Sequence, residues 1–528
     1  MSPVVTERPS IVLCTLNAKY IHASLGLRYL LANMGDLKAQ TAMREFTIAR
    51  KPQEVACELL ALLGPMQDGA VQIVGLGVYI WNVAQSTELV RLLKAARPAL
   101  TIALGGPEVS HEVEQQEIVR LADFVITGWG DVSFPKLCGF LLNGPQPVMK
   151  VIRGEQPPLS EIALPYGEYS DADLAHRLLY VEASRGCPFK CEFCLSSLDK
   201  TAWAFDLDEF LAEMQVLYQR GARNFKFVDR TFNLKVDASA RILQFFLERL
   251  TQDLFLHFEL VPDHLPQRLK DLIVQFPPGV LQFEIGVQSF NPEVQSRISR
   301  RQDNARTEAN LRWLTQASHA HLHTDLIFGL PGETLESFAA GFDRLYALRP
   351  DEIQLGILNR LRGTPIARHS AAHAMVYDAE PPYTVLQTGV LDADTVQRFK
   401  HFVRYWDLLA SSGRFKQTLP LLLEQDQPSP FHAFLAFSDW LWRRTEKTCE
   451  LSPELLVDAL ADYLCGACGM NRQDVQQALL SDYTGSGARS NPHALQGLLP
   501  KQPAPTMRKP KRLAQRQGRH LDPDQALR

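Results

Sequence analysis

The chain has 528 residues, more than one hydrophobic core usually organises, so we expect about three domains. Apolar residues make up 46% and charged residues 22%, as in an ordinary globular protein, and no stretch reaches the roughly 20 continuous apolar residues that span a bilayer. The first residues lack the apolar core of a secretory signal, and a net charge of -4 makes nucleic acid an unexpected partner for the whole chain. These features predict a cytoplasmic globular protein.

Four apolar runs of strand length occur in the first part of the chain, with helical patterns between them. They lie at 10–16, 71–79, 101–104 and 123–127. Near-continuous apolar strands that alternate with helices are typical of a parallel sheet covered on both faces. We therefore predict an α/β, doubly wound Rossmann-like domain over residues 8–140.

In such a sheet the ligand lies beyond the carboxyl ends of the strands. Glycines follow the predicted strands there, where they would let a ligand approach the backbone closely, and aromatic and acidic side chains accompany them. The candidate ligand contacts are Gly77, Trp81, Gly105, Gly106, Glu108 and Gly128. The alternative is that the glycines form only the tight turns that any Rossmann-like fold contains.

A strand followed by a helix recurs six times after a proline-rich connecting segment, which we place at residues 141–176. The six strand patterns lie at 178–186, 224–232, 256–262, 281–290, 323–332 and 352–361. This repeat predicts a partial (β/α)6 barrel over residues 177–370, with its site at the carboxyl ends of the strands.

Three cysteines follow the first of these strands in a C-x3-C-x2-C pattern: Cys187, Cys191 and Cys194. Thiolates are the usual ligands of iron-sulfur clusters, and three of them would leave one iron of a cubane cluster open for chemistry. The alternative, three buried apolar cysteines, is disfavoured because Pro188, Lys190 and Glu192 make this a polar turn rather than an apolar run. We predict a metal site formed by the three cysteines.

Polar residues and glycines also follow the later barrel strands, where a purely structural strand would not need them. The candidates for cofactor binding are Asp229, Glu284, Gln288, Ser289, Gly329, Pro331 and Gly332. Any one of them could be a helix cap or part of a salt bridge at the barrel mouth. As a set at one end of one barrel, they predict a binding site.

The last third of the chain has helical spacing of large apolar residues, which predicts a helical domain over residues 371–484. Cys449, Cys465 and Cys468 could form part of a second metal site. The surrounding pattern favours an amphipathic helix that ends near Gly466 or Gly469, with the cysteines as small core residues. Residues 485–528 form a basic segment with few large apolar residues, which predicts a disordered tail.

The cysteine loop resembles the signature of the radical S-adenosylmethionine (SAM) enzymes, with Phe193 where that family has an aromatic residue. The segments 229–233, 284–289 and 325–333 resemble the SAM-binding elements of the same family. The resemblance implies a [4Fe-4S] cluster on the three cysteines, whose electron splits SAM into methionine and a 5'-deoxyadenosyl radical. It also implies that SAM contacts Phe193 and the tips of the fourth and fifth strands, and that the segment of Asp229 binds the SAM amino group or the substrate.

The segments 104–110 and 123–128 resemble the cobalamin-binding domain that precedes the barrel in one large radical SAM class. No D-x-H-x-x-G motif follows the first strand, so a histidine ligand to cobalt from that motif is not expected. His22 and His111 are the nearby candidates, although a lone loop histidine is more often a surface residue. The C-terminal region resembles an uncharacterised extension of one subgroup of this class.

The resemblance implies a methyl transfer to an unactivated carbon or phosphorus centre, in which one SAM methylates cobalamin and another generates the substrate radical. Three alternatives are a cobalamin-dependent rearrangement or cyclisation, an RNA methylthiotransferase, and a cobalamin-binding sensory module without catalysis. The substrate class stays open among small molecules, lipids and peptides. A reductant such as flavodoxin or ferredoxin is the expected protein partner.

Overall fold

The computed structural model describes residues 8–67, 69–199, 202–424, 429–486 and 490–499. The chain forms two compact units. The first contains residues 1–229 with the returning segments 360–365 and 378–383, and the second contains residues 230–359, 366–377 and 384–528.

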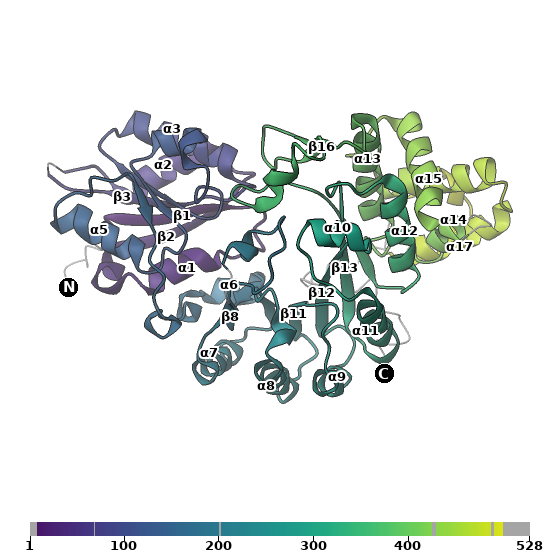
Figure 1. The fold of residues 1–528 in the computed structure, drawn as a ribbon, viewed down its shortest axis with the longest axis horizontal. Coiled ribbons are helices and arrows are strands. Elements are labelled where there is room, and N and C mark those ends of the chain that lie inside the picture. Colours follow the sequence, from purple (N-terminus) through teal and green to yellow (C-terminus); the bar gives the residue numbers. More distant parts are fainter. Residues whose placement is uncertain (1–7, 68, 200–201, 425–428, 487–489, 500–528) are drawn as a thin grey trace. The chain divides into compact units, whose positions relative to one another are not determined.

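The first unit begins with a six-stranded parallel sheet in the order β2-β1-β3-β4-β5-β6 (Figure 1). Its strands are β1 (Ile11–Asn17), β2 (Thr41–Thr47), β3 (Ile73–Gly77), β4 (Thr101–Gly105), β5 (Phe124–Thr127) and β6 (Val151–Arg153). Four of them coincide with the predicted apolar runs, and the predicted parallel sheet is confirmed.

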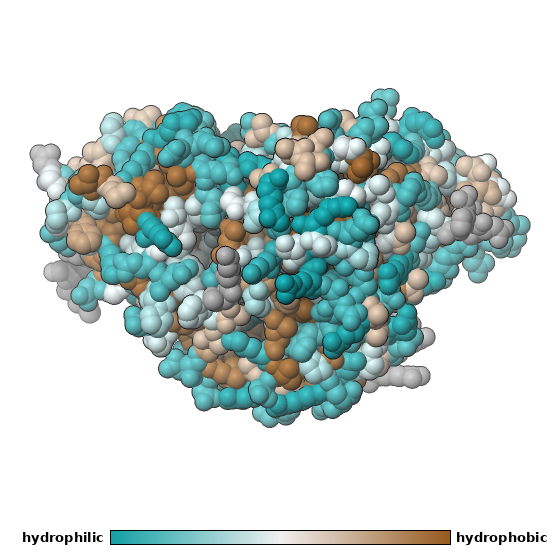
Figure 2. Space-filling model, viewed as in Figure 1, coloured by the Kyte–Doolittle hydropathy of each residue, from teal (hydrophilic) through white to brown (hydrophobic). Residues whose placement is uncertain are grey.

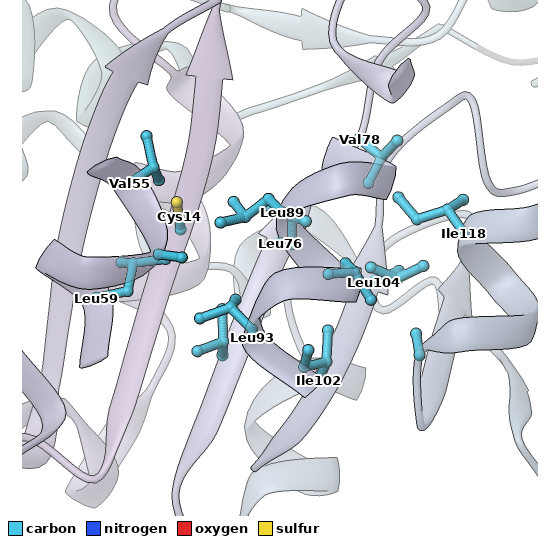
Figure 3. Packing of buried hydrophobic residues seen from close by; sticks show 14 of the residues in the cluster. Cys14, Val55, Leu59, Leu76, Val78, Leu89, Leu93, Ile102, Leu104 and Ile118 are labelled. Carbon is cyan, nitrogen blue, oxygen red and sulfur yellow. The ribbon is translucent and has the colours of Figure 1, made fainter. Parts of the chain in front are cut away.

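Helices cover both faces of this sheet, as the doubly wound prediction requires. They are α1 (Leu25–Ala32), α2 (Pro52–Leu63), α3 (Val83–Ala96), α4 (Glu117–Leu121) and α5 (Ser133–Asn143), with 3-10 turns η1 (Gly35–Gln40) and η2 (Val113–Gln115). Figure 3 shows the core on one face, where Leu59 of α2 and Leu89 of α3 pack with Cys14 of β1. A second core lies on the other face and includes Leu27 of α1 and Phe134 of α5.

The sequence did not indicate β2 and β6, which are the two edge strands of this sheet. Most residues of β2 are only partly buried, and β6 has three residues, none of them fully buried. An edge strand needs no continuous apolar run, because one side of it has no neighbour and its faces are less covered. β6 lies within the segment that we expected to be a linker.

The remainder of the first unit leads into the barrel segment. Its elements are η3 (Leu159–Glu161), η4 (Tyr166–Glu168), α6 (Asp171–His176), β7 (Leu179–Val181), β8 (Ser184–Arg185), η5 (Leu195–Leu198), β9 (Trp203–Ala204), α7 (Leu207–Gln219) and β10 (Asn224–Phe227). β7 pairs with β10 in parallel, and β8 pairs with β9 in antiparallel fashion. The first two predicted barrel strands are therefore β7 and β10.

The second unit continues the alternation of strands and helices. Its strands lie in the order β14-β13-β12-β11, all parallel: β11 (Phe255–Leu260), β12 (Leu281–Gln288), β13 (His321–Phe328) and β14 (Glu352–Ile357). The intervening elements are η6 (Phe232–Leu234), α8 (Val236–Leu247), α9 (Gln267–Ile273), α10 (Pro292–Arg297), α11 (Asn304–Ala317) and α12 (Leu335–Tyr346). All six predicted barrel strands are thus present in the chain.

The C-terminal region of the second unit is helical, as predicted. It begins with η7 (Pro365–His369) and a small hairpin of β15 (Val376–Tyr377) and β16 (Val385–Gln387). The elements that follow are α13 (Ala393–Leu409), α14 (Thr418–Leu423), α15 (Pro430–Thr445), α16 (Pro453–Asp462), a π-helical turn η8 (Tyr463–Ala467), α17 (Arg472–Gly485) and η9 (His493–Leu495). Residues 490–499 were expected in the disordered tail, but Leu495 of η9 is fully buried. The rest of the predicted basic tail, residues 500–528, lies outside the described residues.

The surface in the view of Figure 2 is mostly hydrophilic, with hydrophobic residues gathered over the part of the first unit where Figure 1 places β3 and α5. Among the described residues, no helix combines the length and the apolar character needed to cross a membrane.

Candidate functional site

A pocket of about 280 Å³ lies at the carboxyl end of the N-terminal sheet. Four of the predicted contacts lie in its wall, namely Gly77, Gly105, Gly106 and Gly128. They come from the ends of β3, β4 and β5, where strand ends of a parallel sheet converge. The sequence therefore located this cavity, which belongs entirely to the first unit.

The glycines give this pocket a wall of bare backbone. Gly106 has φ +112°, and a Cβ there would lie 2.4 Å from the backbone oxygen of Val78, so a side chain does not fit. A Cβ on Gly105 would meet nothing closer than 3.9 Å, and one on Gly128 nothing within 4 Å. Side chains at these two positions would project into open space, so the pocket is a cradle that glycine keeps accessible to a ligand.

Two other predicted contacts, Trp81 and Glu108, do not line this pocket. The ring of Trp81 stacks on Tyr79, which does line it, with 4.4 Å between centroids, and its Nε1 donates to Leu16 O at 3.2 Å. Glu108 is buried, and its Oε1 accepts from Arg362 Nε at 2.9 Å and from the Tyr383 hydroxyl at 2.6 Å. Glu108 thus holds the returning segments of the first unit, which differs from the expected cofactor contact.

Neither of the two candidate histidines is a wall residue of the pocket. His22 Nδ1 lies 2.8 Å from the Tyr180 hydroxyl, and the ring of His111 packs against Gly363. The described residues that line the pocket include no histidine.

Arg185 and Asp131 form an ion pair in the pocket wall that the sequence did not single out. Arg185 Nη1 and Nη2 donate to the two carboxylate oxygens of Asp131 at 3.0 and 3.1 Å, and Arg185 Nε donates to Glu182 at 2.6 Å. Burial by itself lowers the pKa of the guanidinium, but the negative charges of Glu182 and Asp131 have the larger effect and raise the pKa. The guanidinium therefore stays positively charged. The only signals in the sequence were the positions of Arg185 beside the cysteine loop and of Asp131 after Gly128.

The cysteine loop starts directly after this arginine. Cys187 and Cys191 are buried, and Cys194 is half-buried, as is Phe193. Backbone bonds from Cys194 N to Cys191 O (3.1 Å) and from Cys187 N to Asp199 O (3.3 Å) close the loop on itself. Three thiols in one closed loop suit an iron-sulfur cluster in donor type and number. In the described ranges, however, no three His, Cys, Asp or Glu side chains converge as a metal-binding group.

Asp229 follows β10 in the first unit, next to the residues that lead into the cysteine loop. Its carboxylate accepts from the Ser184 hydroxyl at 2.6 Å and from Ala183 N at 3.0 Å. Burial raises the pKa of Asp229 to about 7, while these hydrogen bonds act in the opposite direction. The observed role of this carboxyl is to hold the segment that precedes the cysteines.

The other predicted SAM contacts belong to the second unit and lie at the ends of β12 and β13. In β12 the pairing register with β13 shifts around Gln288, which has φ +71°. The buried Oε1 of Gln288 has no hydrogen-bond partner in the described part of the chain, as suits a group that meets a polar ligand. Glu284, also in β12, contacts His257 Nε2 at 3.0 Å.

The glycine turn after β13 is tied to the end of β12. Gly329 and Gly332 have φ +88° and +72°, and Arg297 Nη1 donates to Pro331 O and Gly332 O at 3.4 Å each. The Ser289 hydroxyl donates to Glu333, which directly follows this turn. Burial raises the pKa of Glu333 to about 7, with the hydrogen bond from Ser289 opposing it.

The cysteines of the helical region are less buried than expected. Cys465 lies in the π-helical turn η8 and is half-buried, as is Cys468, and Cys449 is exposed. The helical run ends at Ala467, close to the predicted end at Gly466 or Gly469. These cysteines are therefore not the small core residues that we predicted.

Three protein families match successive parts of the chain. The B12 binding domain matches residues 11–138, the radical SAM superfamily matches residues 181–345, and the family described as Protein of unknown function (DUF4080) matches residues 371–519. These matches follow the order of the pocket, the cysteine loop and the helical region.

Curated relatives and solved structures resemble the chain at low identity. An "Uncharacterized methyltransferase PH0819" of Pyrococcus horikoshii is 23% identical over 62% of this chain and 74% of its own length. The "Cobalamin-dependent radical SAM methyltransferase TokK" of Streptomyces tokunonensis is 24% identical over 57% of this chain, which spans about half (49%) of that relative. The structure of the cobalamin-dependent SAM radical enzyme OxsB with aqua-cobalamin bound matches with a TM-score of 0.58 at 13% identity. The match covers 93% of this chain and 83% of that one, so the two chains share a fold.

Fold, pocket, cysteine loop and family matches together define a cobalamin-dependent radical SAM enzyme. Its C-terminal region, residues 371–519, matches the family described as Protein of unknown function (DUF4080). Its cofactors are those of the class: a [4Fe-4S] cluster, SAM and cobalamin.

Proposed function

We propose that this enzyme is a methyltransferase that moves a methyl group from SAM to an unactivated centre of its substrate. The observation that carries the proposal is that the pocket and the cysteine loop meet at one residue within one compact unit. Arg185 lines the pocket at the end of the B12-binding sheet and stands two residues before Cys187. Two of the relatives are named as methyltransferases, which supports the choice of reaction.

When bound, the cluster supplies the electron that cleaves SAM, and cobalamin supplies a carrier for the methyl group. The residues of the chain bind and orient these groups. Cys187, Cys191 and Cys194 would hold the cluster, and the burial of the first two limits the access of water. The bare backbone of Gly105, Gly106 and Gly128 would let the flat face of a corrinoid approach the strand ends.

In the second unit, polar groups and a glycine turn would receive SAM. Gln288 has a buried amide oxygen without a partner among the described residues, and Ser289 is fixed by its hydrogen bond to Glu333. Gly329, Pro331 and Gly332 would offer backbone groups to the adenine, with Glu284 of β12 as a further contact. We assign the electron supply to a small reductant protein of the flavodoxin or ferredoxin type.

Anaerobic reconstitution with iron, sulfide and hydroxocobalamin tests the proposal. The retained cobalamin is measured by absorbance, the iron by chemical analysis, and the cleavage of SAM by release of 5'-deoxyadenosine under a strong reductant. Cys191→Ser is expected to lose iron and 5'-deoxyadenosine release. Cys57→Ser is the matched control, because Cys57 is an exposed cysteine of α2, and it is expected to behave as the native protein.

The products then separate methyl transfer from the rival reactions. Formation of S-adenosylhomocysteine by the cobalamin-loaded protein supports a methyltransferase. Release of 5'-deoxyadenosine without any S-adenosylhomocysteine would instead indicate a rearrangement or cyclisation. SAM cleavage without retention of cobalamin would overturn the assignment of the N-terminal pocket.

A further inference from the structure

The side chain of Arg185 is enclosed by aromatic rings and carboxylates, all within the first unit. Its guanidinium carbon lies 4.2 Å from the ring centroid of Tyr29, 5.0 Å from that of Trp129 and 5.5 Å from that of Phe205. Its three nitrogens are occupied by Asp131 and Glu182. A planar guanidinium that stacks and forms a two-bonded pair is held in one orientation, which an ammonium would not be.

The groups that fix Arg185 come from the pocket wall and from the segment that leads into the cysteine loop. Tyr29 of α1, Trp129 and Asp131 belong to the wall of the pocket. Glu182 lies between β7 and β8, and its neighbour Ala183 is held by Asp229. The backbone of Arg185 continues through Gly186, at φ +88°, into Cys187. Asp131 and Trp129 therefore contact a residue that stands two positions before Cys187.

We propose that Arg185 is a positioning residue through which a corrinoid in the pocket orders the cysteine loop. The inference rests on the proposed function in one respect, since it takes cobalamin as the ligand of the pocket. It adds that the two cofactor sites are coupled, and it names the residue that couples them.

The coupling follows from the place of Arg185 in the pocket wall, two residues before Cys187. A ligand that packs against Trp129 and the backbone of Gly128 favours the arrangement in which Asp131 and Arg185 are paired, because these residues lie in the same wall. That arrangement fixes the entry of the loop that carries Cys187. Coupling between two binding sites is reciprocal, so formation of the cluster must also strengthen the retention of cobalamin.

Hydrogen exchange of the full chain tests the inference without any assay of turnover. Exchange of the backbone amides of residues 186–199 is measured in the cluster-free protein with and without hydroxocobalamin, and cobalamin retention is measured by absorbance in the same samples. In the native chain, cobalamin is expected to slow the exchange of this loop by about fivefold or more, the lower end of typical coupling between sites. In Arg185→Lys the loop is expected to exchange at nearly the same rate with and without cobalamin.

Two further variants keep the test decisive. Asp131→Asn preserves the shape of the pair and weakens it, so it is expected to reduce the protection of the loop. This variant serves as the test if Arg185→Lys folds poorly. Arg91→Lys is the matched control, because Arg91 pairs with Glu88 and Glu117 on the surface of the same unit, and full protection is expected. Unchanged protection in both Arg185→Lys and Asp131→Asn would overturn the positioning role.

The outcomes also separate this inference from the proposed function. Retention of cobalamin without any slowing of exchange in the native loop overturns the coupling and leaves the proposed function intact. Failure of the native chain to retain cobalamin overturns both. A reciprocal measurement completes the test, because the reconstituted native protein should retain cobalamin more tightly than the cluster-free protein, and Arg185→Lys should lose this difference.

Discussion

The Tyr383 hydroxyl donates a hydrogen bond of 2.6 Å to Oε1 of Glu108, a carboxylate that is 4% exposed and that also accepts from Arg362. Arg362 in addition donates to Glu112, and Arg360 forms a two-bonded pair with Glu112 at 2.9 and 3.1 Å. Through these contacts the segments 360–365 and 378–383 become part of the first unit. Glu108 lies in the loop after β4, so this network braces a loop that begins at the pocket wall.

Replacement of Arg362 by Ala should therefore destabilise the first unit. Removal of one partner leaves the buried Glu108 without its cation, which typically costs about 3–5 kcal/mol of unfolding free energy. Urea denaturation of the native chain, Arg362→Ala, Glu108→Gln and the double variant measures the effect, and the two single losses should not add, since the residues touch. Lys136→Ala removes the exposed pair with Glu155 and should cost no more than about 1 kcal/mol. A loss of only about 1 kcal/mol for Arg362→Ala, as in the control, would contradict the role of Arg362 in bracing this loop.

A methyl group at Gly106 should damage the pocket wall. Its φ of +112° is strained for any L-residue, and the new Cβ would lie 2.4 Å from Val78 O, so Gly106→Ala should cost about 2–3 kcal/mol and weaken cobalamin retention. Gly139→Ala is the control, because Gly139 lies within α5 with no atom within 4 Å of its Cβ, and alanine there should stabilise the chain by up to about 1 kcal/mol. Calorimetry and absorbance of bound cobalamin provide the two measurements. Equal stability of both variants would contradict this account of the wall.

The sequence predicted the elements whose burial leaves a pattern. Apolar runs predicted β1, β3, β4 and β5, and the repeating strand and helix pattern predicted all six barrel strands, because buried parallel strands read as continuous apolar runs. The glycines of the pocket were found because a strand end followed by glycine is a local signal. The edge strands β2 and β6 were missed, since partial burial leaves no such run.

Contacts between distant residues could not be predicted in the same way. Glu108 stood where a ligand contact was expected, but its partners Arg362 and Tyr383 come more than 250 residues later. Arg185 gave little signal, because its role depends on Tyr29, Trp129 and Asp131, which only the folded chain brings around it. A single sequence reports local pattern well and pairing across the fold poorly.

The helical C-terminal region and the barrel strands of the second unit share one aromatic core. Phe399 of α13 stacks on Phe328 of β13 with 3.8 Å between ring centroids, and Trp406 Nε1 donates to Ile353 O of β14 at 2.8 Å. Phe399→Ala should cost about 3–5 kcal/mol, the usual loss for a buried phenylalanine. Phe140→Ala, which alters a half-exposed ring of α5, should cost much less. Calorimetry should show the loss in the transition that unfolds β13 and α13 together, and separate unfolding of the helices would contradict a shared core.

Glu333 should make stability fall as the pH rises. Burial raises its pKa from the usual 4.5 to about 7, so between these values the folded chain binds a proton that the unfolded chain has released. The contribution of Glu333 to the free energy of unfolding is most favourable below the pKa of the unfolded chain. It is lost as the pH rises through the pKa of the folded chain, by an amount on the order of 3 kcal/mol.

Glu333→Gln removes this titration but can still accept the hydrogen bond from Ser289. Relative to the native chain, the variant should be more stable at about pH 8 and should lose that advantage near pH 5, because the native carboxyl is protonated there. Urea denaturation at both pH values measures the difference. Glu54→Gln, which alters an exposed carboxylate of α2 beside Arg50, is the control and should leave the pH dependence as it is. A constant difference between the native chain and Glu333→Gln across this range would show that Glu333 does not titrate as its burial requires.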